Sequence, residues 1–349
     1  MFEINKLPTT IEMDRNISLE VFSNLEFLAY GSNSHIYGAI WNNKQVVVKM
    51  LQNEKMTNPV ALHEFEIECE LLSRIDHPNV IRVLGAGMTP RPFIVLERLR
   101  DMSTVLDLDG SDVRPSMFRR RAFNYLEILK LAKSLADALD YLHSKVHSEA
   151  MIVHRDLKPE NLGITSDGTV KLFDFGLCRC VKKRTSSSEA YTMTGNTGSI
   201  RYMAPEVVLN KPYTEKVDVY SFGILIWAVA RNKHPYRGFT MGEHYTRVVI
   251  GGERPKLEDG WPKDFRDLLS ACWHHNSRSR PNFSVVAAEL SRMIEAKRPT
   301  LQINPADNPA YRQVSTIHRS GIPIPPEPKG AEGGVSRGEG GSRAGTHYR

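Results

Sequence analysis

Apolar residues recur with helix or strand periodicity between Val21 and about Ala296, and the segments on either side lack this pattern. Residues 1–21 are polar and irregular, which predicts an N-terminal extension. Residues 297–349 are rich in Pro, Gly and Arg and offer few side chains that could form a core. Such a composition predicts a disordered tail, because it cannot bury enough apolar area to order itself. The folded part is therefore expected at residues 22–296.

The first third of this part is predicted to be rich in strands. The runs 45–49 and 93–96 are β-branched or apolar, as is typical of strands. The residues between them include a stretch, 61–75, in which apolar side chains recur near helical spacing. These side chains are Leu62, Phe65, Ile67, Leu71, Leu72 and Ile75. One amphipathic helix is thus expected among the strands.

The rest of the folded part is predicted to be helical. Residues 125–143 carry apolar side chains at helical intervals. The longest apolar stretch, 219–230, is too short to cross a bilayer and predicts a buried helix. The pattern therefore indicates an α+β fold with two lobes, a strand-rich lobe at about 22–97 and a larger helical lobe at about 100–296. A cleft between two such lobes is a common place for ligands.

Charge and cysteine content narrow the class of protein. The 46 basic and 40 acidic residues are interspersed, and the densest basic runs, 119–121 and 182–184, are too short for a nucleic-acid footprint. The four cysteines show no CxxC spacing, which predicts free thiols in a reducing compartment. Residues 1–16 lack the apolar core of a signal peptide. We therefore expect a cytoplasmic protein, with the nucleus as the alternative, that has no membrane span and no nucleic-acid partner.

Candidate metal ligands occur at two places in the helical part. Asp174 ends an apolar, strand-like run, where a loop can offer its carboxylate to the cleft. Asp156 and Asn161 lie close enough in sequence for one loop to present both. Mg²⁺ in proteins is held by one or two carboxylates together with phosphate oxygens. These oxygen ligands therefore suit phosphoryl transfer, which depends on positioning and charge neutralisation.

The same residues carry a specific resemblance. The run 154–161 (HRDLKPEN) and the triplet 174–176 (DFG) resemble the catalytic loop and the metal-binding loop of eukaryotic protein kinases. The resemblance covers about residues 22–296 and implies ATP and Mg²⁺ as cofactors. It implies that Asp156 is the base that orients the substrate hydroxyl and that Lys158 contacts the γ-phosphate. By the same resemblance, Asn161 and Asp174 are the Mg²⁺ ligands.

Two residues upstream extend the resemblance. Lys49 ends a predicted strand and resembles the kinase lysine that contacts the α- and β-phosphates. Glu68, on the predicted amphipathic helix, resembles its ion-pair partner. The neighbouring glutamates Glu64, Glu66 and Glu70 are alternative candidates for the ion-pair partner of Lys49.

The predicted phosphate loop departs from the kinase pattern. It aligns on Leu28, Ala29, Tyr30, Gly31, Ser32, Asn33, Ser34, His35 and Ile36. Only Gly31 of the three family glycines is present, and Ala29 and Ser34 take the other two places. Glycine there lets backbone N–H groups approach phosphates closely. We therefore expect weakened rather than abolished ATP binding.

The predicted adenine pocket is atypical as well. Val47 stands where the family usually has alanine above the ring, and Gly163 stands where it usually has a large apolar residue below. Leu96 aligns with the gatekeeper. Glu97 and Leu99 resemble the hinge positions whose backbone groups bind adenine.

Three further residues resemble structural positions of the kinase fold. Glu206 is expected to pair with Arg280, and Asp218 is expected to anchor the catalytic loop from the buried helix.

The substrate class is indicated by four short features. Lys158 and Ser199 resemble Ser/Thr kinases, whereas the run 218–223 (DVYSFG) and the pair Cys272-Trp273 resemble the tyrosine-kinase-like group. Together they identify a tyrosine-kinase-like Ser/Thr kinase that acts on proteins, with dual specificity left open.

Control by phosphorylation is a further hypothesis. Eight hydroxyl residues lie between Leu177 and Gly198, and Arg155 precedes the catalytic aspartate. Phosphorylation within 185–197 would add charge that Arg155 could pair with, which would order the segment. The alternative function is a pseudokinase-like binding module, favoured by the altered phosphate loop.

Overall fold

The structure is a computed structural model that describes residues 2–8, 11–99, 101–104, 123–165, 168–184, 190–191, 193 and 199–297, with the backbone alone for 101–104. The predicted tail lies outside the described residues, apart from Lys297.

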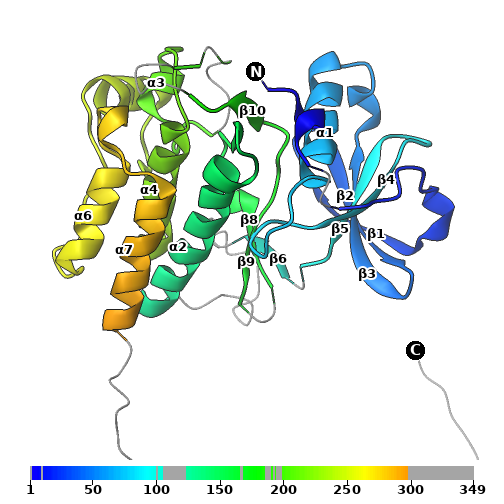
Figure 1. The fold of residues 1–349 in the computed structure, drawn as a ribbon, viewed down its shortest axis with the longest axis horizontal. Coiled ribbons are helices and arrows are strands. Elements are labelled where there is room, and N and C mark those ends of the chain that lie inside the picture. The colour runs from blue at the N-terminus through cyan, green and yellow to red at the C-terminus, as the bar shows by residue number, and fades with distance from the viewer. Residues whose placement is uncertain are drawn as a thin grey trace, which may run out of the picture. The chain divides into compact units, whose positions relative to one another are not determined.

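A five-stranded antiparallel sheet forms the first lobe, in the order β1-β2-β3-β5-β4 (Figure 1). Its central strand β3 buries side chains on both faces, because neighbouring residues of a strand point to opposite sides. Val47 and Leu51 contribute to one core, and Val46 and Val48 contribute to another. The strands are β1 (Ser23–Tyr30), β2 (Ser34–Trp41), β3 (Lys44–Leu51), β4 (Val83–Gly87) and β5 (Phe93–Glu97).

The one long helix of this lobe is α1 (Pro59–Leu72), which begins two residues before and ends three residues before the predicted stretch 61–75. Asn58 starts the helix, since its side chain accepts hydrogen bonds from the backbone N–H groups of Val60 and Ala61. Pro59 occupies the first helical turn, where its missing N–H costs nothing. The helix buries Phe65, Leu71 and Leu72 against the core and carries Glu68 on the same face.

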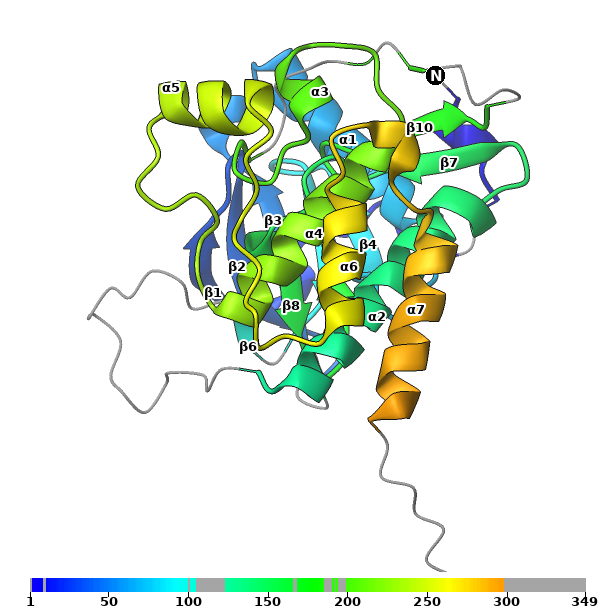
Figure 2. The same ribbon diagram turned by 90° about the vertical axis from the view of Figure 1, so that its left-hand side faces the viewer.

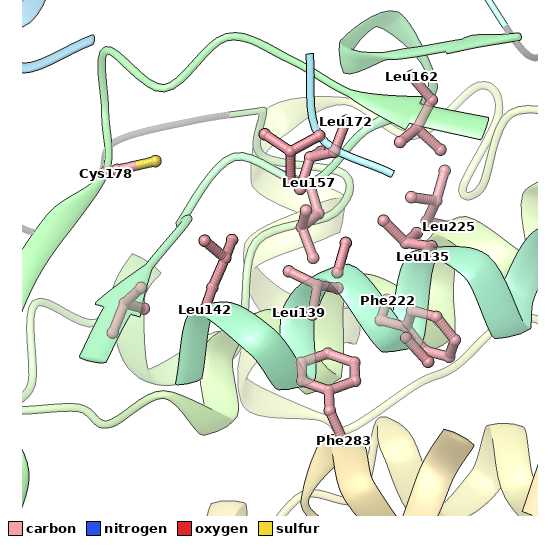
Figure 3. Close-up of a cluster of buried hydrophobic side chains, with 14 of the residues drawn as sticks. Leu135, Leu139, Leu142, Leu157, Leu162, Leu172, Cys178, Phe222, Leu225 and Phe283 are labelled. Carbon is pink, nitrogen blue, oxygen red and sulfur yellow. The ribbon is translucent and has the colours of Figure 1, made fainter. Parts of the chain in front are cut away.

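The second lobe is helical. Its helices are α2 (Tyr125–Asp140), α3 (Pro205–Val208), α4 (Lys216–Arg231), α5 (Met241–Glu243), α6 (Lys263–Cys272) and α7 (Phe283–Ala296), with π-helical turns at Tyr141–Lys145 and His244–Ile250 (Figure 2). A capping box of Asn124 and Glu127 starts α2. Leucines of α2 pack in one buried cluster with Leu157, Leu162 and Leu172 and with phenylalanines of α4 and α7 (Figure 3). The phenylalanines are Phe222 and Phe283.

Short strands lie between the lobes and carry the loops of interest. They are β6 (Asp101–Thr104), β7 (Ala150–Val153), β8 (Leu162–Ile164), β9 (Val170–Leu172) and β10 (Arg179–Lys182), and a 3-10 turn, Pro159–Asn161, precedes β8. Strands β8 and β9 pair with Leu162 opposite Leu172. This register sets the residues just before β8 beside the residues just after β9.

The N-terminal segment differs from its prediction as a polar, irregular extension. Leu7, Ile11 and Ile17 are buried. Leu7 and Ile11 belong to the core that contains Val47, and Ile17 belongs to the core that contains Val46 and Val48. Two 3-10 turns, Ile4–Lys6 and Leu19–Val21, interrupt the segment. Widely spaced apolar residues on an otherwise polar stretch gave no periodic signal, so the sequence pattern missed their burial.

The predicted α+β architecture with two lobes is confirmed, and both lobes belong to one compact unit, residues 1–298. All four cysteines are free, as predicted. Within the described residues, the structure contains no helix that is long and apolar enough to cross a membrane.

Candidate active site

A buried carboxylate on α4 holds the loop that carries Asp156. Asp218 accepts hydrogen bonds from the backbone N–H groups of His154 and Arg155, both at 2.8 Å, and it contacts His143 Nε2 at 2.8 Å. Burial alone would raise the pKa of Asp218, but these hydrogen bonds and the nearby histidines lower it below the usual range. Arg155 has a φ of +72°, which is unusual for a residue with a side chain. The predicted anchoring of this loop by Asp218 is therefore present.

The Asp156 carboxylate is held by three groups. Its Oδ2 accepts from Lys158 Nζ at 2.6 Å and from Asn161 Nδ2 at 3.1 Å. Its Oδ1 accepts from the backbone N–H of Ser199 at 3.0 Å. The structure thus brings Asp156, Lys158 and Asn161 together as expected. The contribution of the Ser199 backbone had no signal in the sequence.

Lys49 joins the first lobe to the loop after β9. Its Nζ lies 2.6 Å from Glu68 Oε2 and 3.1 Å from Asp174 Oδ1. Burial alone would lower the pKa of Lys49, but Asp174 and Glu68 outweigh it and raise the pKa. Lys49 in turn lowers the pKa of the Asp174 carboxyl, which therefore stays ionised.

The structure settles which glutamate of α1 pairs with Lys49. Glu68 does so, whereas Glu64 accepts a hydrogen bond from Asn33 at 3.0 Å and Glu70 pairs with Arg15 and Arg74. Glu66 is exposed. Burial explains the choice, because Glu68 is the glutamate of α1 that packs with Phe65 and Leu72 on the buried face of the helix.

The loops of Asn161 and Asp174 are in direct contact. The backbone N–H of Phe173 donates to the carbonyl oxygen of Asn161 at 3.0 Å. The rings of His154 and Phe175 meet edge to face, with centroids 5.1 Å apart. Asp174 has a φ of +68°, and its side chain is 39% exposed. Its carboxylate is thus available to a ligand beside the Asn161 loop.

These two residues fit a metal shared with a phosphate. Asn161 uses its amide nitrogen toward Asp156, so its amide oxygen can serve as a ligand together with the Asp174 carboxylate. No group of three or more His, Cys, Asp or Glu that could hold a metal lies within the described residues. A site with so few protein ligands suits Mg²⁺, which is usually completed by phosphate oxygens and water.

The predicted phosphate loop forms the turn between β1 and β2. Leu28, Ala29 and Tyr30 end β1, and Ser34, His35 and Ile36 start β2. The turn closes through a 2.7 Å hydrogen bond from the Gly31 N–H to the Ser34 carbonyl oxygen. Tyr30 and His35 belong to a group of aromatic rings that also contains Phe27 and Tyr37.

Gln52 braces this turn. Its side-chain amide donates to the carbonyl oxygen of Gly31 at 3.2 Å, and its backbone N–H donates to that of Asn33 at 3.0 Å. Asn33 is in turn tied to Glu64 of α1. The part of Gln52 was not predictable from the sequence, because a glutamine after a strand carries no recognisable pattern.

At the predicted adenine pocket, the side chain of Leu99 lies where a side chain at position 163 would lie. A Cβ on Gly163 would come 2.3 Å from Leu99 Cδ1. Val47 and Leu99 are both buried. Glu97 forms an ion pair with Lys171 of β9 at 2.8 Å. Leu99, one of the predicted hinge residues, therefore occupies the space that a side chain at position 163 would need.

The end of the activation segment is also as expected. Arg280 and Glu206 form a two-point ion pair, with distances of 2.5 and 3.0 Å. Arg155 contacts the Tyr213 hydroxyl at 2.9 Å and the Leu177 carbonyl oxygen at 2.7 Å. Most hydroxyl residues of 185–197 lie outside the described residues. Tyr191 is described, and its hydroxyl donates to the carbonyl oxygen of Lys182.

Comparison with known proteins agrees with this geometry. Residues 22–290 match the protein tyrosine and serine/threonine kinase family. The serine/threonine/tyrosine-protein kinase HT1 of Arabidopsis thaliana is 30% identical over 280 residues, which cover 79% of this chain and 67% of that protein. The serine/threonine-protein kinase VIK of the same plant is 30% identical over 277 residues, or 78% of this chain and 60% of that protein.

A third relative, the dual specificity protein kinase shkE of Dictyostelium discoideum, is 30% identical over 270 residues, or 77% of this chain and 36% of that protein. The matched regions thus make up between 36% and 67% of the three relatives. The family match, by contrast, covers most of the two-lobed unit described here. The chain belongs to the protein tyrosine and serine/threonine kinase family, as its resemblance to the tyrosine-kinase-like group predicted.

Proposed function

We propose that this chain transfers the γ-phosphate of ATP, in the presence of Mg²⁺, to serine and threonine hydroxyls of proteins. The observation that carries the proposal is the contact of two clusters of polar and charged side chains. Asp156, Lys158 and Asn161 form one, and Lys49, Glu68 and Asp174 form the other. The Phe173–Asn161 hydrogen bond joins their loops.

Asp156 is proposed as the residue that receives the acceptor hydroxyl and takes its proton. Its carboxylate is fixed from three sides but remains an acceptor, which suits a base that must orient one hydrogen bond. Lys158, now paired with Asp156, is proposed to contact the γ-phosphate. A positive charge there would stabilise the charge that spreads over the phosphate oxygens during transfer.

Asn161 and Asp174 are proposed to hold the metal. Mg²⁺ bound there would neutralise the charge of the phosphates. Lys49 is proposed to contact the α- and β-phosphates, while Glu68 keeps its ammonium group in place. Residues 28–36 would cover the phosphates. Val47, Glu97, Leu99 and Gly163 would surround the adenine ring.

Serine and threonine are the preferred acceptors in this proposal. Lys158 and Ser199 carry the Ser/Thr signature, and both contact Asp156 directly. HT1 and shkE are named as kinases that also accept tyrosine or have dual specificity. Dual specificity therefore remains part of the proposal, as does a cytoplasmic or nuclear location.

A binding module without turnover is the competing function, and it is favoured by the two glycines that the phosphate loop lacks. The test is incubation of the purified full chain with Mg-ATP and a generic basic protein substrate. We expect transfer by the wild-type chain and a loss of about 10²- to 10⁴-fold in Asp156→Ala, the range typical of a general base. Absence of transfer from a phosphorylated wild-type preparation would instead support the binding module.

We also propose control by phosphorylation within residues 185–197. Arg155 contacts Leu177 and Tyr213, and Tyr213 pairs with Tyr191 of this segment, so an added phosphate would have to compete for the Arg155 guanidinium group. Lys183 and Arg184 are also engaged, with backbone carbonyls and with Glu215. Phosphatase treatment is expected to lower the transfer rate. A variant lacking the hydroxyls of 185–197 that transfers phosphate as fast as the untreated wild type would contradict the proposal.

A further inference from the structure

The segment before the first strand contacts both lobes. We call its described residues, 2–8 and 11–17, the N-terminal strap. In Figure 1 the strap is dark blue and runs from β10 past α1 toward β4. The family match begins only at residue 22, so the strap lies outside the part that the kinase family shares.

The first contact is with the second lobe. The backbone N–H of Phe2 donates to the carbonyl oxygen of Cys180 in β10 at 2.9 Å. The Phe2 ring lies 5.2 Å from the ring of His147, measured between centroids. Strand β10 follows Gly176 by three residues, so the strap begins on the activation segment.

The second contact is with the C-terminal end of α1. Leu7 and Ile11 are buried in the same core as Leu71 and Leu72 of α1. The backbone N–H of Ile11 donates to the carbonyl oxygen of Ser73 at 3.1 Å. The guanidinium group of Arg74 donates to the carbonyl oxygen of Leu7. The chain just after α1 is thus held by backbone and side-chain hydrogen bonds.

Charged side chains reinforce this contact. Arg15 Nη2 lies 2.7 Å from Glu70 Oε2 and 3.2 Å from the Ser73 hydroxyl. Arg74 binds the other carboxylate oxygen of Glu70. Burial alone would raise the pKa of Glu70, but hydrogen bonds from the two arginines lower it. Glu70 therefore stays charged and keeps the strap and α1 together.

The third contact is with the sheet edge at β4. Asp14 pairs with Gly85 in parallel, and the Ile17 N–H donates to the Ala86 carbonyl oxygen at 3.0 Å. A Cβ on Gly85 would come 2.2 Å from Ile17 Cδ1, and one on Gly87 would come 2.3 Å from the Ile17 carbonyl oxygen. Glycines inside a strand mark places where another backbone approaches closely. The strap accounts for Gly85, whereas Gly87 is approached by the strap and by the Phe93 ring alike. The strap also covers an otherwise open edge of the sheet.

We propose that the N-terminal strap is a positioning element for phosphoryl transfer, because it fixes the end of α1 and so keeps Glu68 against Lys49. The inference rests on the proposed kinase function. Ser73 lies about 7.5 Å beyond Glu68 along the helix axis, given a rise of about 1.5 Å per residue. Release of the strap would free this end of α1 from β4 and β10. Glu68 would then lose its fixed distance to Lys49.

The test compares two double variants of the full chain. Leu7→Ala with Ile11→Ala removes the buried side chains of the strap. Glu3→Ala with Lys6→Ala is the matched control, because these side chains are 65% and 60% exposed and pair only with each other in the described structure. Each chain is measured for kcat/KM with ATP and for hydrogen exchange of the α1 and α4 amides.

The Leu7/Ile11 variant is expected to lose about 10- to 100-fold in kcat/KM, since a displacement of about 1 Å can cost about 10²-fold. Its α1 amides should exchange faster while those of α4 stay protected. A synthetic peptide of residues 1–18, added in excess, should restore part of the activity. The control should match the wild type in kcat/KM and in the hydrogen exchange of both helices.

Two outcomes would overturn the inference. One is a Leu7/Ile11 variant whose kcat/KM lies within about twofold of the control, with no change in α1 exchange. The other is faster exchange in α1 and α4 alike, because a general loss of stability moves both helices. A wild-type chain without transfer would contradict the proposed function instead, and the exchange pattern alone would then decide whether the strap holds α1.

Discussion

Replacement of Asp174 by alanine is expected to lower the rate of phosphate transfer by about 10³-fold. The variant loses the one partly exposed carboxylate at the junction of the two clusters, and metal stabilisation of a transition state is worth several kcal/mol. Lys49 keeps its ion pair with Glu68, so the fold of the site should persist. The measurement is kcat at saturating Mg-ATP, with thermal unfolding followed in parallel.

The control for this variant is Asp259→Ala, which removes an exposed carboxylate from a loop of the second lobe. It should leave kcat and the unfolding temperature unchanged. A rate for Asp174→Ala within about threefold of the wild type would show that this carboxylate does not take part in transfer. A large fall in the unfolding temperature of Asp174→Ala would instead show that this carboxylate stabilises the folded structure.

Replacement of Asp218 by asparagine is expected to lower the free energy of unfolding by about 3 to 5 kcal/mol, the range for breaking a buried charged network. Both oxygens of Asp218 accept backbone N–H bonds, from His154 and Arg155. An amide offers one oxygen and one NH₂ group, so one of these buried N–H groups would face another donor. The measurement is urea unfolding followed by circular dichroism.

Asp267→Asn is the matched control for Asp218, because its carboxylate is 62% exposed and pairs with Lys263 on the surface. The free energy of unfolding of this control should change by no more than about 0.5 kcal/mol. The Asp218 variant should also lose most of its transfer activity, since the catalytic loop would no longer be held. Unchanged stability in Asp218→Asn would mean that the loop is anchored by other contacts.

Much of the fold was predictable because it follows from local patterns. The β-branched run 45–49 lies in β3, and the helical spacing in 125–143 gave α2 and the turn after it. The pairing of Glu206 with Arg280 and the anchoring by Asp218 followed from the resemblance, and the structure contains both. Such features can be predicted from the sequence around each residue or from a specific motif.

The remainder depends on contacts between distant segments. Spacing alone left four glutamates of α1 as partners of Lys49, and only packing against the sheet selects Glu68. Gln52 and Asn33 brace the phosphate turn through partners 21 and 31 residues away. The strap was predicted to be an irregular extension, because apolar residues scattered among polar ones do not show what they pack against. The resemblance predicts a part for the backbone of Leu99, yet its side chain fills the space that a Cβ on Gly163 would need.

Transfer to serine and threonine is tested most directly by phosphoamino-acid analysis of a protein substrate incubated with Mg²⁺ and ATP labelled at the γ-phosphate. The wild-type chain and Asp156→Ala are compared at equal concentration, after both are shown to unfold at the same temperature. The proposed function predicts labelled phosphoserine and phosphothreonine with the wild type and at least about 10²-fold less label with the variant. Equal labelling by the two chains, or none by the wild type in any phosphorylation state, would contradict it.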